Sequence, residues 1–372
     1  MQILAIDVGT GTQDILVYDP SGPVENSPKL VMPSPTATAA KRIRAATAAR
    51  RTVVLTGANA GGGPSSWALS DHLAAGLPTF ATRKAAETIN DDLDAVTEIG
   101  VQLVSEEEAA KIDGEQIELR DIDLDAIRTA LQAFGAEPHF DGVAIGVLDH
   151  GAAPPDVSDR LFRFQHLERV LRQDPDARAF ASLPEDLPEY LTRARCALDS
   201  AQSDVPTVFM DNGAAAALGA LHDPASASAG QQFVLNVGNM HALGYVIDSG
   251  RLLAVFEHHT GELQPQRLAE LVDELVAGTL TNEAVFNSQG HGTLYLDDGP
   301  FDATVTVVTG PRRSVVEPYL PNAVAAAPHG DMMISGCFGL LEGFAYRVPE
   351  AEEFVAQLRP RDASLPRAAQ RN

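Results

Sequence analysis

A short apolar strand, a glycine turn and a second apolar strand occur together twice in this chain, and this repetition constrains the fold more than any other feature. The first copy is ILAIDVGTGTQDILVYD at residues 3–19, and the second is FVLNVGNMHALGYVIDSG at residues 233–250. After each copy the sequence predicts a third strand, a helix and a further strand. We therefore expect an α/β protein of two similar lobes, each a mixed sheet flanked by helices, with a cleft between them where a ligand binds.

The boundary between the two lobes falls in a segment rich in Pro, Ala, Ser and Gly at residues 223–230. We expect the first lobe at residues 1–222, the second lobe at residues 231–347, and a polar, flexible tail at residues 348–372. Within the first lobe, residues from about 78 to 134 indicate an inserted α/β segment. A chain of 372 residues is long enough to bury two cores without a disulfide or a metal to hold it together.

The composition excludes several classes of function. The formal net charge is −24, from 51 acidic and 27 basic residues. No basic run is long enough to follow a phosphate backbone, so neither a nucleic acid nor an anionic membrane is an expected partner. No apolar run reaches the length of a membrane span, and the first residues do not resemble a signal peptide, which predicts a cytoplasmic protein.

The first glycine turn carries the strongest chemical signal. Asp7 ends a buried strand, and the turn Gly9, Thr10, Gly11 and Thr12 follows it. Glycines let the backbone approach an anion, and consecutive N–H groups with threonine hydroxyls can hold phosphate oxygens. Asp7 could then hold Mg²⁺ through water. The spacing matches neither GxGxxG nor GxxxxGK[ST], which excludes the Rossmann and P-loop interpretations; the alternative is an ordinary β-hairpin.

The turn in the second copy is a weaker version of the first. Asn236 stands in the place of Asp7, and Gly238 stands in the place of Gly9, with Asn239 after it. An asparagine cannot supply a charge. We expect this turn to hold phosphate from the second lobe through neutral donors.

These motifs resemble the phosphate loops of the actin, sugar-kinase and Hsp70 ATPase superfamily. VFMDNGAAAALGAL at residues 208–221 is similar to the small-residue helix that precedes the second lobe in that superfamily, and DMMISGCFGLLEGF at residues 331–344 resembles its strand and glycine turn under the adenosine. The resemblance implies two RNase H-like lobes in an actin-like ATPase fold, with ATP and Mg²⁺ in the cleft. It also implies that Gly336 and Gly339 lie under the adenosine.

The chain also resembles a narrower prokaryotic family that is labelled a pyruvate formate-lyase activating enzyme. Segments that carry this resemblance include TGANAGGGPSSWAL, AIGVLDHGAAPPDVSDRLFRF and HGDMMISGCFG. The label implies a radical-SAM enzyme with cysteines spaced as CxxxCxxC. Cys196 and Cys337 are the two cysteines of the chain and cannot form that cluster, so we reject this activity.

Asp149 and His150 end another buried strand of the first lobe and are expected to face the cleft. A base or a water-orienting residue at that place would serve phosphoryl transfer, whereas the alternative is that Asp149 caps the next turn. Several histidines of the second lobe lie near turns: His241, His258, His259 and His291. Together with Asp149 and His150 they could build a transition-metal site, or they could be surface and capping residues.

Two further motifs suit anion binding. Gly61, Gly62 and Gly63 precede a helix and could offer backbone donors to a substrate, or they could form a plain loop. Arg312 and Arg313 follow a strand and could clamp a phosphate or a carboxylate, or they could be a surface pair.

Three functions agree with these observations. The first is a small-molecule kinase or an ATP hydrolase, with ATP and Mg²⁺ bound in the cleft. The second is a nucleotide-dependent switch without catalysis that acts on a protein partner, which the asparagine in the second turn leaves open. The third is a metal-dependent enzyme that uses the histidines and has lost ATP. The fold alone does not decide among them.

Overall fold

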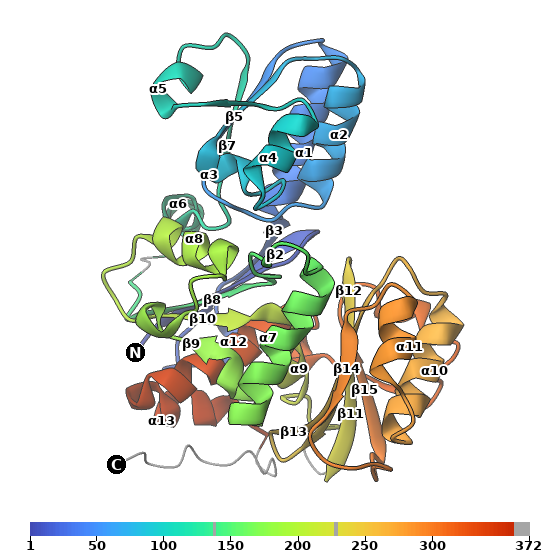
Figure 1. Cartoon of the computed structure of the whole chain (residues 1–372). Coiled ribbons are helices and arrows are strands. Elements are labelled where there is room, and N and C mark those ends of the chain that lie inside the picture. The colour runs from blue at the N-terminus through green and yellow to red at the C-terminus, as the bar shows by residue number, and fades with distance from the viewer. Residues whose placement is uncertain (137–138, 227–229, 361–372) are drawn as a thin grey trace.

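The computed structural model describes residues 1–136, 139–226 and 230–360. Figure 1 shows two lobes side by side and a smaller domain above the first of them. In the described residues the strands form a six-stranded sheet in each lobe and a four-stranded sheet in the smaller domain, which confirms the two-lobed α/β architecture. None of the helices in these ranges has both the length and the hydropathy that spanning a bilayer requires. Residues 227–229 of the expected linker at 223–230 lie outside the described residues.

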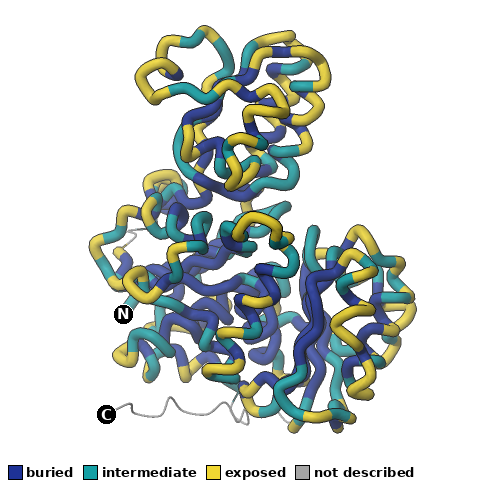
Figure 2. The backbone as a smooth tube through the Cα atoms, viewed as in Figure 1, coloured by how far each residue is buried: buried dark blue, intermediate teal, exposed yellow. Residues whose placement is uncertain are grey.

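The sheet of lobe I has the strand order β3-β2-β1-β8-β10-β9. Its strands are β1 (Ile3–Val8), β2 (Thr12–Tyr18), β3 (Lys29–Pro33), β8 (Gly142–Val147), β9 (Ala181–Ser182) and β10 (Thr207–Asp211). β1 is antiparallel to β2 and parallel to β8, which is parallel to β10. β1 and β8 are apolar runs because helices cover both faces of the sheet, and Figure 2 shows these central strands buried. The carboxyl ends of the parallel strands therefore meet at one edge.

The sheet of lobe II has the strand order β14-β13-β12-β11-β15-β16. Its strands are β11 (Gln231–Val237), β12 (His241–Asp248), β13 (Arg251–His259), β14 (Gly292–Tyr295), β15 (Val305–Thr309) and β16 (Val324–Ala325). In both sheets three consecutive antiparallel strands are followed by a strand parallel to the first, as β8 is to β1 and β15 is to β11. This RNase H-like order in both lobes confirms the actin-like ATPase fold.

The long helices form layers around the two sheets, in the order helix, sheet, helix, sheet, helix (Figure 1). α6 (Leu124–Ala133) and α8 (Thr192–Ala201) cover the outer face of the lobe I sheet. Three helices lie between the sheets: α7 (Asp159–Gln173), α9 (Asn212–Ala220) and α12 (Ser335–Arg347). α10 (Pro265–Val276) and α11 (Asn282–Asn287) cover the outer face of the lobe II sheet.

α9 and α12 pack backbone to backbone. A Cβ on Gly219 would lie 1.6 Å from the carbonyl oxygen of Ser335, and a Cβ on Gly339 would lie 1.8 Å from that of Ala215. Small residues therefore serve helix packing at this contact. The sequence predicted a strand and then a glycine turn here, and this was wrong: Gly336 and Gly339 lie inside α12, because the small residues at its start pack against α9.

The smaller domain interrupts lobe I between β3 and α6. Its parallel strands are β4 (Val53–Gly57), β5 (Thr79–Thr82), β6 (Gln102–Val104) and β7 (Glu115–Leu119). Its helices are α1 (Pro35–Ala48), α2 (Pro64–Ala74), α3 (Arg83–Ala86), α4 (Leu93–Glu98) and α5 (Glu106–Ala109). It spans residues 35–119, not the expected 78–134, because Ile43 of α1 packs into its core whereas Leu131 of α6 packs into lobe I.

The chain after residue 348, expected to be a flexible tail, is packed as far as the structure describes it. Ala351, Val355 and Leu358 recur at helical spacing and are buried in the core of lobe I. Residues 361–372 lie outside the described residues. Short helical segments complete the described chain: η1 (Val24–Asn26), η2 (Ala177–Phe180), η3 (Pro184–Asp186), η4 (Arg313–Val315), η5 (Pro328–Gly330), η6 (Pro349–Ala351), α13 (Glu352–Val355) and η7 (Ala356–Leu358).

Candidate functional site

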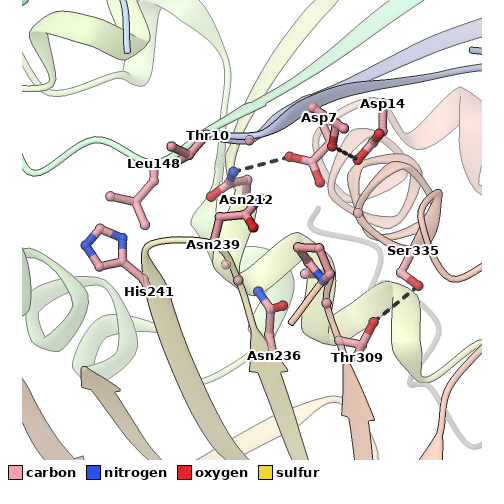
Figure 3. Close-up of a pocket in the computed structure, with 18 of the residues that line it drawn as sticks. Asp7, Thr10, Asp14, Leu148, Asn212, Asn236, Asn239, His241, Thr309 and Ser335 are labelled. Carbon is pink, nitrogen blue, oxygen red and sulfur yellow. Dashed lines mark hydrogen bonds between the residues drawn. The ribbon is translucent and has the colours of Figure 1, made fainter. Parts of the chain in front are cut away.

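A cavity of about 800 Å³, part of it open solvent, lies between the two lobes. The turn of each β-hairpin, the chain that follows β8 and β15, and the first residues of α9 and α12 line it, and Figure 3 shows their side chains around one space. A polar cavity between two lobes is a common place for a small ligand to bind. The polar side chains of the lining include Asp7, Asp14, Asn212, Asn236, Asn239, Thr10, Thr12, Thr309 and Ser335.

The turns of the two hairpins face each other across this cavity. Gly9 donates its N–H to the carbonyl of Thr12 over 2.9 Å, and Gly238 makes the equivalent bond in the second hairpin over the same distance. A Cβ on Gly11 would lie 2.5 Å from Nδ2 of Asn239. The glycine turns are therefore in contact, and a side chain at position 11 would require the side chain of Asn239 to move.

Ser34 ties the first turn to the smaller domain. Its hydroxyl donates to the carbonyl of Thr10 over 2.7 Å, and its N–H donates to the carbonyl of Gly11 over 3.1 Å. The same hydroxyl accepts the N–H of Ala37 and so caps α1, the first helix of the smaller domain. The start of that domain is therefore attached directly to the turn.

Two carboxylates lie side by side below the first turn. Asp7 of β1 and Asp14 of β2 are cross-strand partners, and both line the cavity. Burial raises the pKa of Asp7 to about 7, against the hydrogen bond that Asn212 donates to it over 3.2 Å. Burial and the charge of Asp7 raise the pKa of Asp14 to about 8. No sequence motif marks Asp14. Counting residues outward from the turn along both strands nevertheless identifies it as the cross-strand partner of Asp7.

Two helices begin next to Asp7. Asn212 is the first residue of α9, and its side chain also donates to the carbonyl of Val8 over 3.3 Å. Gly336 lies at the start of α12, where a Cβ would lie 1.9 Å from Oδ2 of Asp7. A side chain at this position would displace the carboxylate. Asp211 caps the start of α9 by accepting the N–H groups of Gly213 and Ala214, whereas no side chain caps the start of α12, so the positive end of α12 is the one that favours an anion in the cavity.

Of the glycines that the sequence placed around the ligand in this part of the chain, Gly238 and Gly336 line the cavity but Gly339 does not. Gly310 lines the cavity directly after β15, whereas Gly339 lies against Ala215 and is not among the lining residues. Arg312 and Arg313 follow but do not line the cavity either; Arg312 is exposed, and Arg313 donates to the carbonyl of Gly310 over 3.4 Å.

Asp149 is turned away from the cavity. Its carboxylate oxygens accept the N–H of Gly151 over 2.8 Å and that of Ala194 over 2.9 Å. It is buried and does not line the cavity. The geometry therefore gives it the capping role that the sequence left open, and it offers no support for Asp149 as the catalytic base.

Arg193 reaches the cavity from α8, and no sequence motif marks it. It donates to the carboxylate of Asp121 over 2.8 Å and to the carbonyl of Leu148 over 2.7 Å. A Cβ on Gly61 would lie 2.6 Å from its guanidinium, so the loop of Gly61, Gly62 and Gly63 packs beside it and lies outside the cavity lining. Arg193 brings a positive charge to the cavity.

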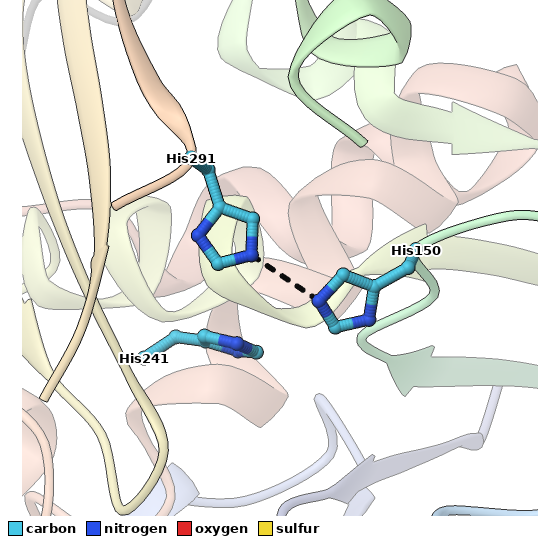
Figure 4. A group of neighbouring side chains, drawn as sticks. All are labelled: His150, His241 and His291. Atoms are coloured by element: carbon cyan, nitrogen blue, oxygen red, sulfur yellow. Dashed lines mark hydrogen bonds between the residues drawn. The ribbon is translucent and has the colours of Figure 1, made fainter. Parts of the chain in front are cut away.

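Three of the predicted histidines come together beside the cavity. One ring nitrogen from each of His150, His241 and His291 lies within 4.8 Å of the other two (Figure 4). Burial lowers the pKa of His150 to about 3 and also lowers the pKa of the other two, so the rings are neutral. His258 does not join them, because its Nε2 lies 3.1 Å from the hydroxyl of Ser288.

Solved structures with similar chain paths show low identity to this chain. The ethanolamine utilization protein EutJ from Carboxydothermus hydrogenoformans is 10% identical, with 91% of this chain and 89% of that chain covered and a TM-score of 0.33. The activator of the 2-hydroxyisocaproyl-CoA dehydratase from Clostridium difficile, with bound ADPNP, is 9% identical, with 98% and 100% covered and a TM-score of 0.33. The ROK hexokinase from Thermus thermophilus is 13% identical, with 94% and 100% covered and a TM-score of 0.33.

These TM-scores are too low to support a fold assignment, which therefore rests on the strand order of the two sheets. None of the curated proteins matches the chain. Residues 60–315, more than half of the chain, match a family described as "Putative pyruvate format-lyase activating enzyme". This range includes part of the smaller domain, the histidines and the second hairpin, and on this match the chain belongs to that family.

Proposed function

We propose that the protein binds a nucleoside triphosphate together with Mg²⁺ between its lobes, and transfers the terminal phosphoryl group to a small molecule or to water. The observation that carries this proposal is the pair of Asp7 and Asp14, placed where two glycine turns from opposite lobes meet over the cavity. Phosphoryl transfer depends mainly on positioning and on neutralising charge, and these are the groups that such a site needs.

The phosphates would lie between the two turns. Gly9, Thr10 and Thr12 line the cavity from lobe I, Gly238 and Asn239 line it from lobe II, and the uncapped first turn of α12 adds backbone donors. Arg193 supplies the charged donor. Closure of the lobes would exclude bulk water from the reacting groups.

Asp7 and Asp14 fit the requirements of Mg²⁺, which prefers carboxylate and water oxygens. Oδ1 of Asp14 is buried and has no hydrogen-bond partner among the described residues. Burial raises the pKa of both carboxyl groups, and the charge of Asp7 adds to the shift at Asp14; a cation bound to the pair would favour their ionised forms. When bound, Mg²⁺ would neutralise charge on the phosphate oxygens.

The same geometry favours one second candidate, a switch that binds nucleotide without rapid turnover and acts on a protein partner. Both oxygens of Asp149 are engaged by backbone N–H groups, so the described cavity lining has no carboxylate besides Asp7 and Asp14. A base for activating an acceptor would have to come from that pair. The radical chemistry in the family description is not part of this proposal, because the chain has only two cysteines and both are buried on different helices.

Calorimetric titration with ATP and Mg²⁺, together with a phosphate-release assay, tests the proposal. Asp7→Asn and Asp14→Asn keep the shape of the protonated side chains and should fold. Each should weaken binding about tenfold or more, because a hydrogen-bonded or ionic contact to a charged group contributes roughly 1.5–3 kcal/mol. Asp125→Asn is the matched control, since that side chain is 96% exposed and lies on α6.

The outcomes separate the two candidates. Binding with phosphate release that both variants reduce would support phosphoryl transfer. Binding without release, together with lobe closure, would favour the switch. Absence of binding at millimolar ATP, or equal binding by all variants, would contradict both.

A further inference from the structure

Three imidazoles meet at the boundary of the two lobes, beside the nucleotide cavity. His150 follows β8 in lobe I, whereas His241 begins β12 and His291 directly precedes β14 in lobe II. Figure 4 shows the three rings turned toward one another. His241 also lines the cavity. The group therefore joins elements that are far apart in sequence and belong to different lobes.

The spacing of the ring nitrogens suits a metal ion. Nε2 of His150 lies 3.2 Å from Nε2 of His291. Nitrogens bound to a tetrahedral ion at about 2.0–2.1 Å are roughly 3.3 Å apart, so these two nitrogens already have the required separation. The nitrogen of His241 is within 4.8 Å of both, and a shift of about 1.5 Å or less would close the triangle.

The hydrogen bonding of these rings is incomplete without a ligand. Nε2 of His241 is buried and has no partner among the described residues. His291 is 1% exposed, and its Nε2 has only the ring of His150 as a close partner, which satisfies at most one N–H. Leaving a buried polar atom unpaired costs about 1–3 kcal/mol. If each ring carries its proton on the other nitrogen, the three neighbouring nitrogens have free lone pairs, which is the state that metals bind. The N–H on Nδ1 of His291 then has no partner among the described residues.

A buried ion-pair network lies beside the histidines. Arg163 is buried and pairs with Asp211 over 2.5 Å and with Glu257 over 3.2 Å. Oε1 of Glu257 lies 4.0 Å from Nε2 of His291. The two carboxylates would offset part of the charge of a divalent cation on the histidines, whereas the guanidinium of Arg163, whose charge lowers the pKa of all three rings, acts against it. The case for a cation therefore rests on the nitrogens themselves.

We propose that His150, His241 and His291 bind a divalent first-row transition metal ion such as Zn²⁺, at a site distinct from the carboxylate pair of Asp7 and Asp14. Three imidazole ligands leave a coordination position for water or for a substrate group, as in catalytic zinc sites. Because the ligands come from both lobes, the ion also ties lobe I to lobe II.

Zinc titration of the full-length protein, after treatment with a chelator and in the absence of nucleotide, tests this inference. Wild type should bind one ion per chain. His150→Ala, His241→Ala and His291→Ala should each weaken the affinity by roughly 100-fold or more, since loss of an outer hydrogen-bond partner alone costs about 10–100-fold. His139→Ala is the control, because that side chain is 81% exposed and lies outside the group.

Two further measurements keep the result clear. Thermal unfolding without metal shows whether each variant folds. With Zn²⁺ the midpoint should rise for wild type and for His139→Ala but not for the three ligand variants, because an ion that binds only the folded state stabilises it. In wild type, bound Co²⁺ should give the intense visible absorption bands of a four- or five-coordinate ion. Bands as weak as those of the hydrated ion, or zinc affinities unchanged in the three variants, would overturn the inference. Asp7→Asn should bind zinc normally, so loss of nucleotide binding and loss of the metal site can be told apart.

Discussion

Asp7 and Asp14 make the two hairpins chemically unequal, although their backbones match. At the equivalent places the second hairpin has Asn236 and Leu243, which are paired in the same register. A cation can therefore be held by carboxylates from lobe I only. At the scale of single residues the two sides of the cavity therefore differ: a bound cation would lie on the lobe I side, and neutral amide groups would face it from lobe II.

The pH dependence of stability follows from these two residues. In the metal-free folded protein their pKa values are about 7 and 8, against an ordinary value of 3.8. The folded state therefore holds protons that the unfolded chain has released, and this stabilisation is complete below about pH 4 and is lost as the pH rises through 7 and 8. From about pH 5 to 9 in chelator, the unfolding midpoint of wild type should fall relative to that of Asp14→Asn, which lacks the contribution of Asp14. The buried histidines, whose pKa values are lowered, act in the opposite sense but equally in both proteins. A difference between the two midpoints that stays constant over this range would contradict the shift at Asp14.

At the scale of elements, the contact of α9 with α12 positions the site. Both helices begin at the cavity, one with Asn212 and the other with Ser335, and both lie between the two sheets. Their close approach depends on Gly219 and Gly339. The distance between the helices therefore sets where Asn212 and Gly336 meet Asp7.

Gly339→Ala tests this dependence. The new methyl group would lie 1.8 Å from the backbone of Ala215, so the helices must separate, at a cost of about 2–3 kcal/mol in the free energy of unfolding. Gly343→Ala, on the same helix, is the control: there the nearest atom is the flexible Sδ of Met210, at 2.6 Å, and alanine favours a helix. Chemical denaturation of both variants checks this, and equal losses of stability would contradict it.

At the scale of the whole molecule, the lobes are joined by contacts of different kinds. The turns of Gly11 and Asn239 touch, and Arg163 from α7 pairs with Glu257 of lobe II as well as with Asp211 of lobe I. Arg163 is 1% exposed, so this ion pair is buried between the lobes. Removing one partner of a buried pair is costly, and the pair therefore limits how far the lobes can separate without breaking it.

Binding of nucleotide should draw the lobes together. A ligand that contacts both turns favours the closed arrangement by its differential affinity for it. Small-angle X-ray scattering should show a smaller radius of gyration for wild type with ATP and Mg²⁺ than without, and Asp7→Asn should show no such change at the same concentrations. A radius that stays constant in wild type under saturating ligand would contradict closure.

The local pattern of apolar residues and glycines predicted the hairpins, the two sheets and the cavity, because a turn and its flanking strands are specified by residues close in sequence. The same reasoning could have identified Asp14, since the turn sets the register in which it pairs with Asp7. It could not have identified Arg193, because the position of that residue depends on where α8 packs on the sheet. The approach of His150 to His291 joins residues far apart in the chain, so the sequence could name these histidines but could not show which of them meet.

The bonds from Ser34 to Thr10 and Gly11 make a joint between the first turn and the smaller domain. The turn is close to this joint, whereas the far helices of that domain are distant from it (Figure 1). If contact with a phosphate group tilted the turn, the far helices would be displaced further than the turn itself. Occupancy of the cavity would then be detectable from outside the molecule as a movement of the smaller domain.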